Sequence, residues 1–154
     1  IFVADVVNNR VQRCPASGSG DCTTVAGTAG SGDCTTVAGG QGAGSGAQQL
    51  RNPTGIALAP GGDIIVSDHN NHRVQRCPAA GRGDCTTVAG SQGQGWGPQQ
   101  LNGPYAVALA PDGDIIVAGT AWRPGCDLFN HRVQRCPAAG SGDCTTVAGG
   151  QRGP

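Results

Sequence analysis

The feature that most constrains this chain is an internal repeat. Leu50 and Leu101 stand 51 residues apart in matching contexts, and so do Asp63 and Asp114, which fixes the basic period. A repeat of this length is typical of architectures in which each unit packs on its neighbours. The string RVQRCPA recurs at 10–16, 73–79 and 132–138, and DCTTVAG recurs at 21–27, 33–39, 84–90 and 143–149.

Each full unit holds four short runs of strand-forming residues separated by turn signals. In the middle unit these runs are 54–60, 63–68, 72–78 and 85–90, called strands a, b, c and d in that order. Glycine is abundant, at 28 of 154 residues, and Lys, Glu and Met are absent, which argues against helices. The sequence predicts an all-β propeller segment of three antiparallel blades, the first without its innermost strand, and no helices.

Two insertions and the linkers give the expected domain organisation. Residues 1–39 form a partial blade with strands b, c and d, in which 28–39 nearly duplicates 16–27 and offers a second copy of strand d. Residues 40–90 form a full blade with its linker, and residues 91–154 form another, with an insertion at 120–129 and a trailing linker. Three blades are fewer than a closed propeller needs, so closure comes from further sequence, from a second copy, or not at all.

The middle unit carries the pattern P-x-G-I-A-L-A-P-G-G-D-I-I-V-S-D-H-N-N-H-R-V-Q, which resembles the NHL repeat of β-propellers. The Asn-His-Arg motif stands at 71–73 and again at 130–132, and Asn9-Arg10 is a version without the histidine. The likeness covers nearly the whole chain. The Cys- and Gly-rich tail of each unit departs from the family pattern.

Six of the eight cysteines form pairs with the spacing C-x7-C. If strands c and d form a hairpin with Cys77 opposite Cys85, Val74 falls opposite Val88, and cross-strand disulfides are plausible. The alternative is that these thiols are small buried hydrophobic groups between blades. Cys34 and Cys126, both in insertions, have no evident partner. The three candidate disulfides are Cys14–Cys22, Cys77–Cys85 and Cys136–Cys144.

Aspartate and arginine flank the turn between strands b and c. We expect Asp68 to pair with Arg73 and Asp5 with Arg10, in a structural and not a catalytic role. In the third unit Gly119 stands where the aspartate belongs, so the turn before Arg132 is predicted to lack this pairing.

The sequence points to no catalytic residue, no cofactor and no metal. His72 and His131 belong to the repeated motif, which marks them as scaffold, and His69 is a lone histidine that the repeat does not explain. The glycine-rich stretches at 39–46 and 91–97 lead into strands, whereas a phosphate cradle needs a helix directly after the glycines. They are predicted to be linkers between blades.

Four of the five aromatic residues lie in or beside the third unit. In a four-stranded meander the d–a linkers and the b–c loops emerge at the same face, so these side chains would meet there. Exposed Trp and Arg side chains are typical anchors for a partner. The alternative is that the insertion buries its own aromatic residues. The candidate partner-binding residues are His69, Trp96, Tyr105, Trp122, Arg123, Asp127 and Phe129.

These observations favour a non-catalytic scaffold that binds a protein or peptide through its b–c and d–a loop face. The resemblance also implies two alternatives, a single-stranded RNA-binding propeller and a lyase- or lactonase-type enzyme. The formal net charge of zero disfavours RNA. The chain has no apolar run long enough to span a membrane, and self-association would complete the propeller. Oxidised hairpin cysteines would place it outside the cell or in the secretory lumen, and reduced ones in the cytoplasm.

Overall fold

The computed structural model describes residues 1–14, 35–81, 83–119, 131–140 and 142–149. Within these ranges the chain forms short strands joined by turns, with one 3-10 turn and no α-helix. The elements are β1 (Phe2–Asp5), β2 (Arg10–Arg13), β3 (Thr35–Gly39), β4 (Pro53–Leu58), β5 (Ile64–Asp68), η1 (His69–Asn71), β6 (Arg73–Cys77), β7 (Thr86–Ala89), β8 (Pro104–Leu109), β9 (Ile115–Gly119), β10 (Arg132–Cys136) and β11 (Thr145–Gly149).

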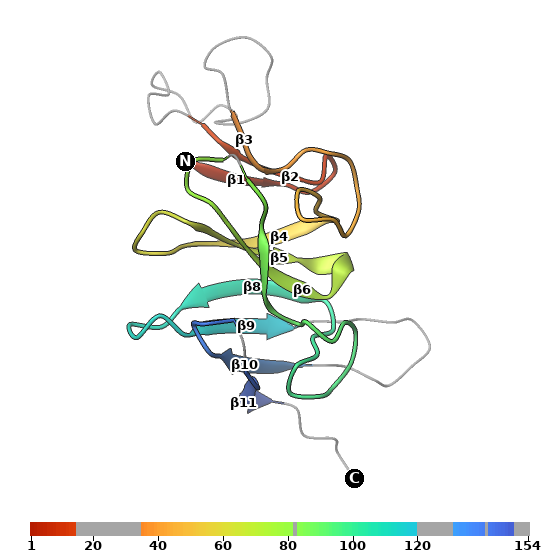
Figure 1. Cartoon of the computed structure of the whole chain (residues 1–154). Coiled ribbons are helices and arrows are strands. Elements are labelled where there is room, and N and C mark those ends of the chain that lie inside the picture. Colours follow the sequence, from red (N-terminus) through yellow and green to blue (C-terminus); the bar gives the residue numbers. More distant parts are fainter. Residues whose placement is uncertain (15–34, 82, 120–130, 141, 150–154) are drawn as a thin grey trace, which may run out of the picture.

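The strands form three antiparallel meanders, which we call blades one, two and three. Blade one has the order β1-β2-β3, blade two β4-β5-β6-β7, and blade three β8-β9-β10-β11. The blades lie one above another in chain order, as Figure 1 shows. The predicted all-β fold is therefore confirmed, including a first blade with strands b, c and d. The strands of each blade fall inside the unit boundaries expected from the sequence, and those boundaries stay a prediction.

The duplicated segment offered two copies of strand d for blade one. The structure uses the second copy, because β3 at Thr35–Gly39 pairs with β2. The first copy lies outside the described residues.

Each pairing of strands c and d contains a β-bulge, which corrects one predicted register. Val74 lies opposite Ala89 and not opposite Val88, and the next pair is Gln75 with Thr87. Val88 is thus the extra residue of the bulge, which lets a twisted edge strand follow its neighbour. Beyond the bulge the predicted alignment resumes, and Cys77 bonds to Cys85. The same shift recurs in the other two blades.

The core lies between the blades. Adjacent residues of β5 face opposite neighbours: Ile64 joins the cluster against blade one and Ile65 the cluster against blade three. This explains why every residue of β5 is buried. Blade two therefore buries both faces of its sheet, one against each neighbouring blade, so few apolar residues are enough to form both interfaces.

The bulged valines show how neighbouring blades fit together. A Cβ at Gly81 would lie 3.0 Å from Val37, and one at Gly140 would lie 3.1 Å from Val88. The loop between strands c and d of one blade thus presses a glycine onto the bulge of the blade before it. Val88 is 7% exposed under this contact, whereas the equivalent Val147 of blade three is 55% exposed.

Across the described ranges, no helix is long and apolar enough to cross a membrane.

Candidate functional site

The turn between strands b and c is built around a buried ion pair. Arg73 Nε donates to Asp68 Oδ2 at 2.8 Å, and the Asp68 side chain is fully buried. The same pairing joins Arg10 to Asp5 at 2.8 Å in blade one, where both side chains are more exposed. Both expected pairings are observed, and their structural role stays a prediction. Each carboxylate holds a guanidinium across one rung of the sheet, because Asp68 and Arg73 are register partners.

Blade three lacks this pair, as Gly119 predicts. Arg132 is the register partner of Gly119. Its Nη1 and Nη2 donate to the carbonyl oxygens of Trp96 and Gln100 at 2.9 and 3.2 Å. Within the described ranges its buried Nε has no hydrogen-bond partner. Burial lowers the pKa of the Arg132 guanidinium from its ordinary value, because a charged group loses hydration there.

The linkers between blades lie at the same end of the molecule as the b–c turns. Arg73 donates to the carbonyl oxygens of Ser45, Gly46 and Gln49 in the preceding linker. Asn71 Nδ2 donates to the carbonyl oxygen of Gly44. The predicted meeting of the d–a linkers with the b–c turns is thus observed in blade two. We call this end of the molecule the loop face.

Two exposed aromatic side chains lie at the loop face. Trp96 is 40% exposed, and the Arg132 guanidinium stands 6.0 Å from its ring centroid. Tyr105 is 56% exposed, and its ring meets His69 edge to face at 6.1 Å. His69 Nδ1 lies 3.1 Å from the Pro104 carbonyl oxygen. Each aromatic ring therefore has a partner on another element that fixes its position.

The structure brings His69 and Tyr105 together and sets Trp96 against Arg132. The remaining candidate partner-binding residues, Trp122, Arg123, Asp127 and Phe129, lie outside the described residues.

The histidine of the repeat has a structural role that the sequence did not specify. His72 adopts a left-handed backbone with φ 54°, and its Nδ1 accepts a hydrogen bond from the Gly103 N–H at 3.1 Å. Asn9, the equivalent residue of blade one, has the same φ, and its Oδ1 accepts from the Asn52 N–H at 2.9 Å. Each side chain therefore ties a b–c turn to the linker entering the next blade. Burial first and His69 second lower the pKa of His72, against the attraction of Asp68.

Sequence reasoning missed a second set of ion pairs at the opposite end of the blades. Arg76 Nε donates to Asp63 at 2.8 Å, and Arg135 Nε donates to Asp114 at 2.7 Å. Arg135 also contacts Asp112. Hydrogen bonds from arginine and from a backbone N–H lower the pKa of both Asp63 and Asp114. The sequence does contain a sign of these pairs, because the aspartates recur in the string GDIIV and the arginines in the string RVQRC.

Two predicted disulfides are present, Cys77–Cys85 and Cys136–Cys144. The alternative of free thiols is therefore wrong for these four cysteines, although all four are buried and belong to the clusters between blades. Cys14 is also buried, whereas Cys22 lies outside the described residues.

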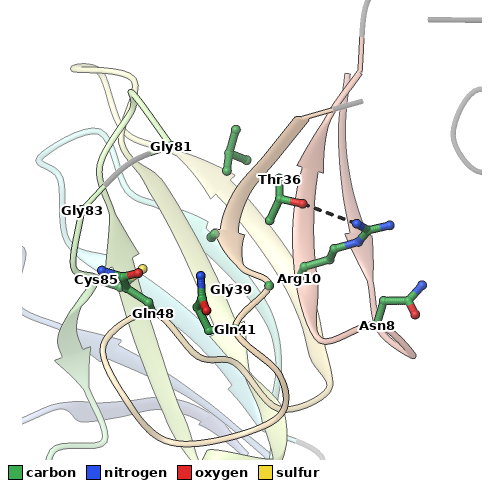
Figure 2. Close-up of a pocket in the computed structure, with 12 residues that line it drawn as sticks. Asn8, Arg10, Thr36, Gly39, Gln41, Gln48, Gly81, Gly83 and Cys85 are labelled. Atoms are coloured by element: carbon green, nitrogen blue, oxygen red, sulfur yellow. Dashed lines mark hydrogen bonds between the residues drawn. The ribbon is translucent and has the colours of Figure 1, made fainter. Parts of the chain in front are cut away.

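A cavity of about 650 Å³ opens between blades one and two. Figure 2 shows Thr36 and Gly39 of β3 on one wall and Gly81, Gly83 and Cys85 on the other. Its remaining lining includes side-chain amides and the guanidinium of Arg10, which already pairs with Asp5. These groups offer hydrogen bonds to a polar molecule. The lining comes from repeated residues, so no sequence signal distinguished it.

In the part of the chain that the structure describes, no group of three or more His, Cys, Asp or Glu residues is arranged to hold a metal ion.

A family model described as the NHL repeat matches residues 50–77. No curated protein matches the chain. The matched segment begins at Leu50 in the linker and ends at Cys77, so it includes β4, β5, η1 and β6 of blade two. It also includes both the Asp68–Arg73 pair and His72. Residues 50–77 of blade two therefore match the NHL repeat, and the three sheets of the chain form propeller-type blades.

Proposed function

We propose that the chain is a non-catalytic scaffold that binds a protein or peptide at the loop face. The observation that carries this proposal is the pair of exposed aromatic side chains, Trp96 and Tyr105. Both rings are held by side chains of other elements, so little conformational entropy is lost when a partner covers them. Aromatic rings of this kind are common anchors of interfaces. The 120–129 insertion, with Trp122 and Arg123, is expected to extend the same surface.

A capture experiment with single variants tests this proposal. Wild-type chain, Trp96→Ala and Tyr105→Ala are immobilised and compared for retention of binding proteins. The control is Leu58→Ala, because Leu58 is 50% exposed and lies at the far end of β4 from the loop face. Retention lost in both aromatic variants and kept in the control supports the proposal. Equal retention by all four proteins contradicts it.

We further propose that the chain works in an oxidising compartment. Two C-x7-C pairs are bonded, and such disulfides persist where glutathione does not reduce them. Non-reducing peptide mapping of the chain from its native source should return Cys77 linked to Cys85 and Cys136 linked to Cys144. Complete alkylation of these four thiols without reductant would contradict this.

Self-association is the third part of the proposal. Val147 occupies the position at which Val37 and Val88 are buried by the next blade, yet it is 55% exposed. A second copy that covers this face would reproduce an interface the chain already makes twice. Light scattering of the chain should therefore show a dimer or larger species, and Val147→Asp should shift it toward monomer. A wild-type monomer at high concentration would rule this out.

A further inference from the structure

The linker that enters blade three ends in an Asn-Gly pair. Asn102 and Gly103 directly precede β8, and every other asparagine of the chain is followed by a residue other than glycine. In such a pair the backbone nitrogen of the glycine can attack the side-chain amide carbon of the asparagine, because no Cβ crowds the glycine. The groups around the two amides decide whether this reaction takes place in the folded chain.

The nucleophilic nitrogen of the pair faces an imidazole. The Gly103 N–H donates to His72 Nδ1 at 3.1 Å, which is the reach that a general base needs. Burial first and His69 second lower the pKa of His72 from 6.5, against the attraction of Asp68. At pH 7 the imidazole is therefore neutral, and its lone pair points at the proton that the nitrogen must lose.

A hydrogen-bond donor meets the other reacting group, the side-chain amide of Asn102. Gln94 Nε2 donates to Asn102 Oδ1 at 3.0 Å. Attack on the amide carbon moves negative charge onto this oxygen, and a donor directed at it stabilises that charge. The backbone beside the pair is also held, because Gly95 N donates to the Leu101 carbonyl oxygen at 3.0 Å. The base and the donor thus lie on the two atoms whose charge changes in the reaction.

The equivalent linker into blade two has neither the base nor the reactive amide. Arg51 and Asn52 stand at the positions of Asn102 and Gly103. The backbone is the same, since φ is 52° at Asn52 and 55° at Gly103. The Asn52 N–H donates to Asn9 Oδ1 at 2.9 Å, and an amide oxygen is not a base at neutral pH. The structural contact between a turn and the next linker therefore does not require an imidazole.

We propose that Asn102 is a self-modification site, at which the folded chain converts asparagine into aspartate and isoaspartate with His72 as general base. His72 Nδ1 takes the proton of the Gly103 N–H as this nitrogen bonds to Asn102 Cγ. Nδ2 of Asn102 leaves as ammonia with that proton, which restores the neutral imidazole and closes a succinimide ring. Water then opens the ring at either carbonyl. Nothing is oxidised or reduced, and water is the only co-reactant.

The products change both the charge and the path of the linker. Either form places a new carboxylate beside the b–c turn of blade two. Isoaspartate also adds a methylene group to the main chain between blades two and three. The reaction needs no partner, so this inference goes beyond the proposed function and does not depend on it.

The test follows residue 102 in the intact, folded chain during incubation at pH 7. Mass spectrometry of the peptide measures the gain in mass from amide to acid, and enzymatic methylation of isoaspartate detects the rearranged product. Both products should accumulate at residue 102. The other asparagines are the internal reference and should stay unchanged over the same period.

The matched variant is His72→Asn, which copies the contact of Asn9 and removes the base. We expect the rate constant at Asn102 to fall by about 10- to 100-fold, up to the lower end of what general bases contribute. A second variant, Gln94→Ala, removes the donor at an exposed position where water can replace it. It should slow the reaction by about 10-fold or less.

Urea provides the control for the local sequence. In the unfolded chain His72 no longer faces Gly103, so the wild type and His72→Asn should react at the same rate. Equal rates in the two folded proteins, or a faster reaction in folded His72→Asn, would overturn the proposal. A folded wild-type chain that keeps its asparagine at 102 while the unfolded chain loses it would overturn it as well.

Discussion

Blades two and three were built from nearly the same sequence, and they differ most at the corner between strands b and c. In blade two, Asp68 is buried against Arg73 and three donors converge on its carboxylate. In blade three, glycine replaces the aspartate, and Arg132 is held by linker carbonyls and Trp96 instead. In the first corner Asp68 accepts from Arg73 Nε, and in the second Arg132 Nε has no acceptor among the residues that the structure describes.

This difference distinguishes residues that every blade needs for its fold from residues that vary between blades. Residues that agree between copies make the contacts that any blade needs: the bulge, the disulfide and the tie from a turn to the next linker. The departure at position 119 removes the ion pair that the other two blades share. A repeat protein keeps such a departure at little risk to its fold, because each blade depends mainly on its immediate neighbours.

We expect the largest loss of stability when the carboxylate of blade two is removed. Asp68→Ala leaves the Arg73 guanidinium without its counter-charge, and the Arg73 side chain is only 13% exposed. The three linker carbonyls still hold Arg73, so we expect a loss near the lower end of the range for such pairs, about 3 kcal/mol. Denaturant unfolding measures it.

Asp5→Ala is the control for this prediction. The Asp5–Arg10 pair has the same geometry but lies closer to solvent, so its loss should cost about 1 kcal/mol or less. Equal losses at Asp5 and Asp68 would show that burial does not distinguish the two corners.

Much of the fold could be predicted from the sequence because the repeat shows which residues recur from one unit to the next. Strand positions, blade order and the Cys77–Cys85 link came from residues that recur in each copy, and the Asp68–Arg73 pair came from residues that the first two copies share. The bulge at Val88 did not, since a one-residue shift leaves no mark in composition and depends on how an edge strand twists. The valine pairing predicted across that hairpin was wrong for this reason.

The site was less predictable than the fold. Gly119 pointed to a missing pair, and Trp96 and Tyr105 were recognised as exposed candidates. The side chains that contact these two rings could not be predicted. His69 and Tyr105, for example, belong to different blades, and their contact depends on how far apart the blades lie. The role of His72 was hidden for the same reason, as its partner Gly103 stands in the next linker.

A second test addresses how closely blades two and three approach. Gly55 of β4 faces the backbone of β8, where a Cβ would lie 2.8 Å from the Tyr105 carbonyl oxygen and 2.9 Å from the Ala106 Cα. Backbone atoms do not move aside cheaply, so Gly55→Ala should destabilise the chain by about 2 kcal/mol through overpacking. Thermal unfolding measures this loss.

Ala106→Gly is the control. Ala106 is the equivalent residue of blade three and is exposed, so this change should alter stability by less than about 1 kcal/mol. A neutral Gly55→Ala would mean that the blades stand further apart.

The smallest expected effect is a pH dependence of stability that comes from the hydrogen bond between His72 and Gly103 of the next linker. His72 Nδ1 accepts the Gly103 N–H, so it must be unprotonated there, and burial lowers its folded-state pKa below 6.5. Below pH 6.5 the unfolded chain therefore binds a proton that the folded chain does not. Stability falls as the pH drops from 6.5 toward the folded-state pKa, and this term is constant above and below that window.

Asn9 shows which substitution isolates this effect. It holds the same left-handed backbone and accepts the equivalent linker N–H without titrating. His72→Asn should therefore match the wild type at pH 8 and lose less stability on acidification to pH 5. The difference should be within about 1 kcal/mol, the worth of one such hydrogen bond. Denaturant midpoints at pH 5, 6, 7 and 8 measure it. An unchanged pH dependence in the variant would contradict the assignment of this effect to His72. The His72 bond would then contribute to geometry alone, as the Asn9 bond does.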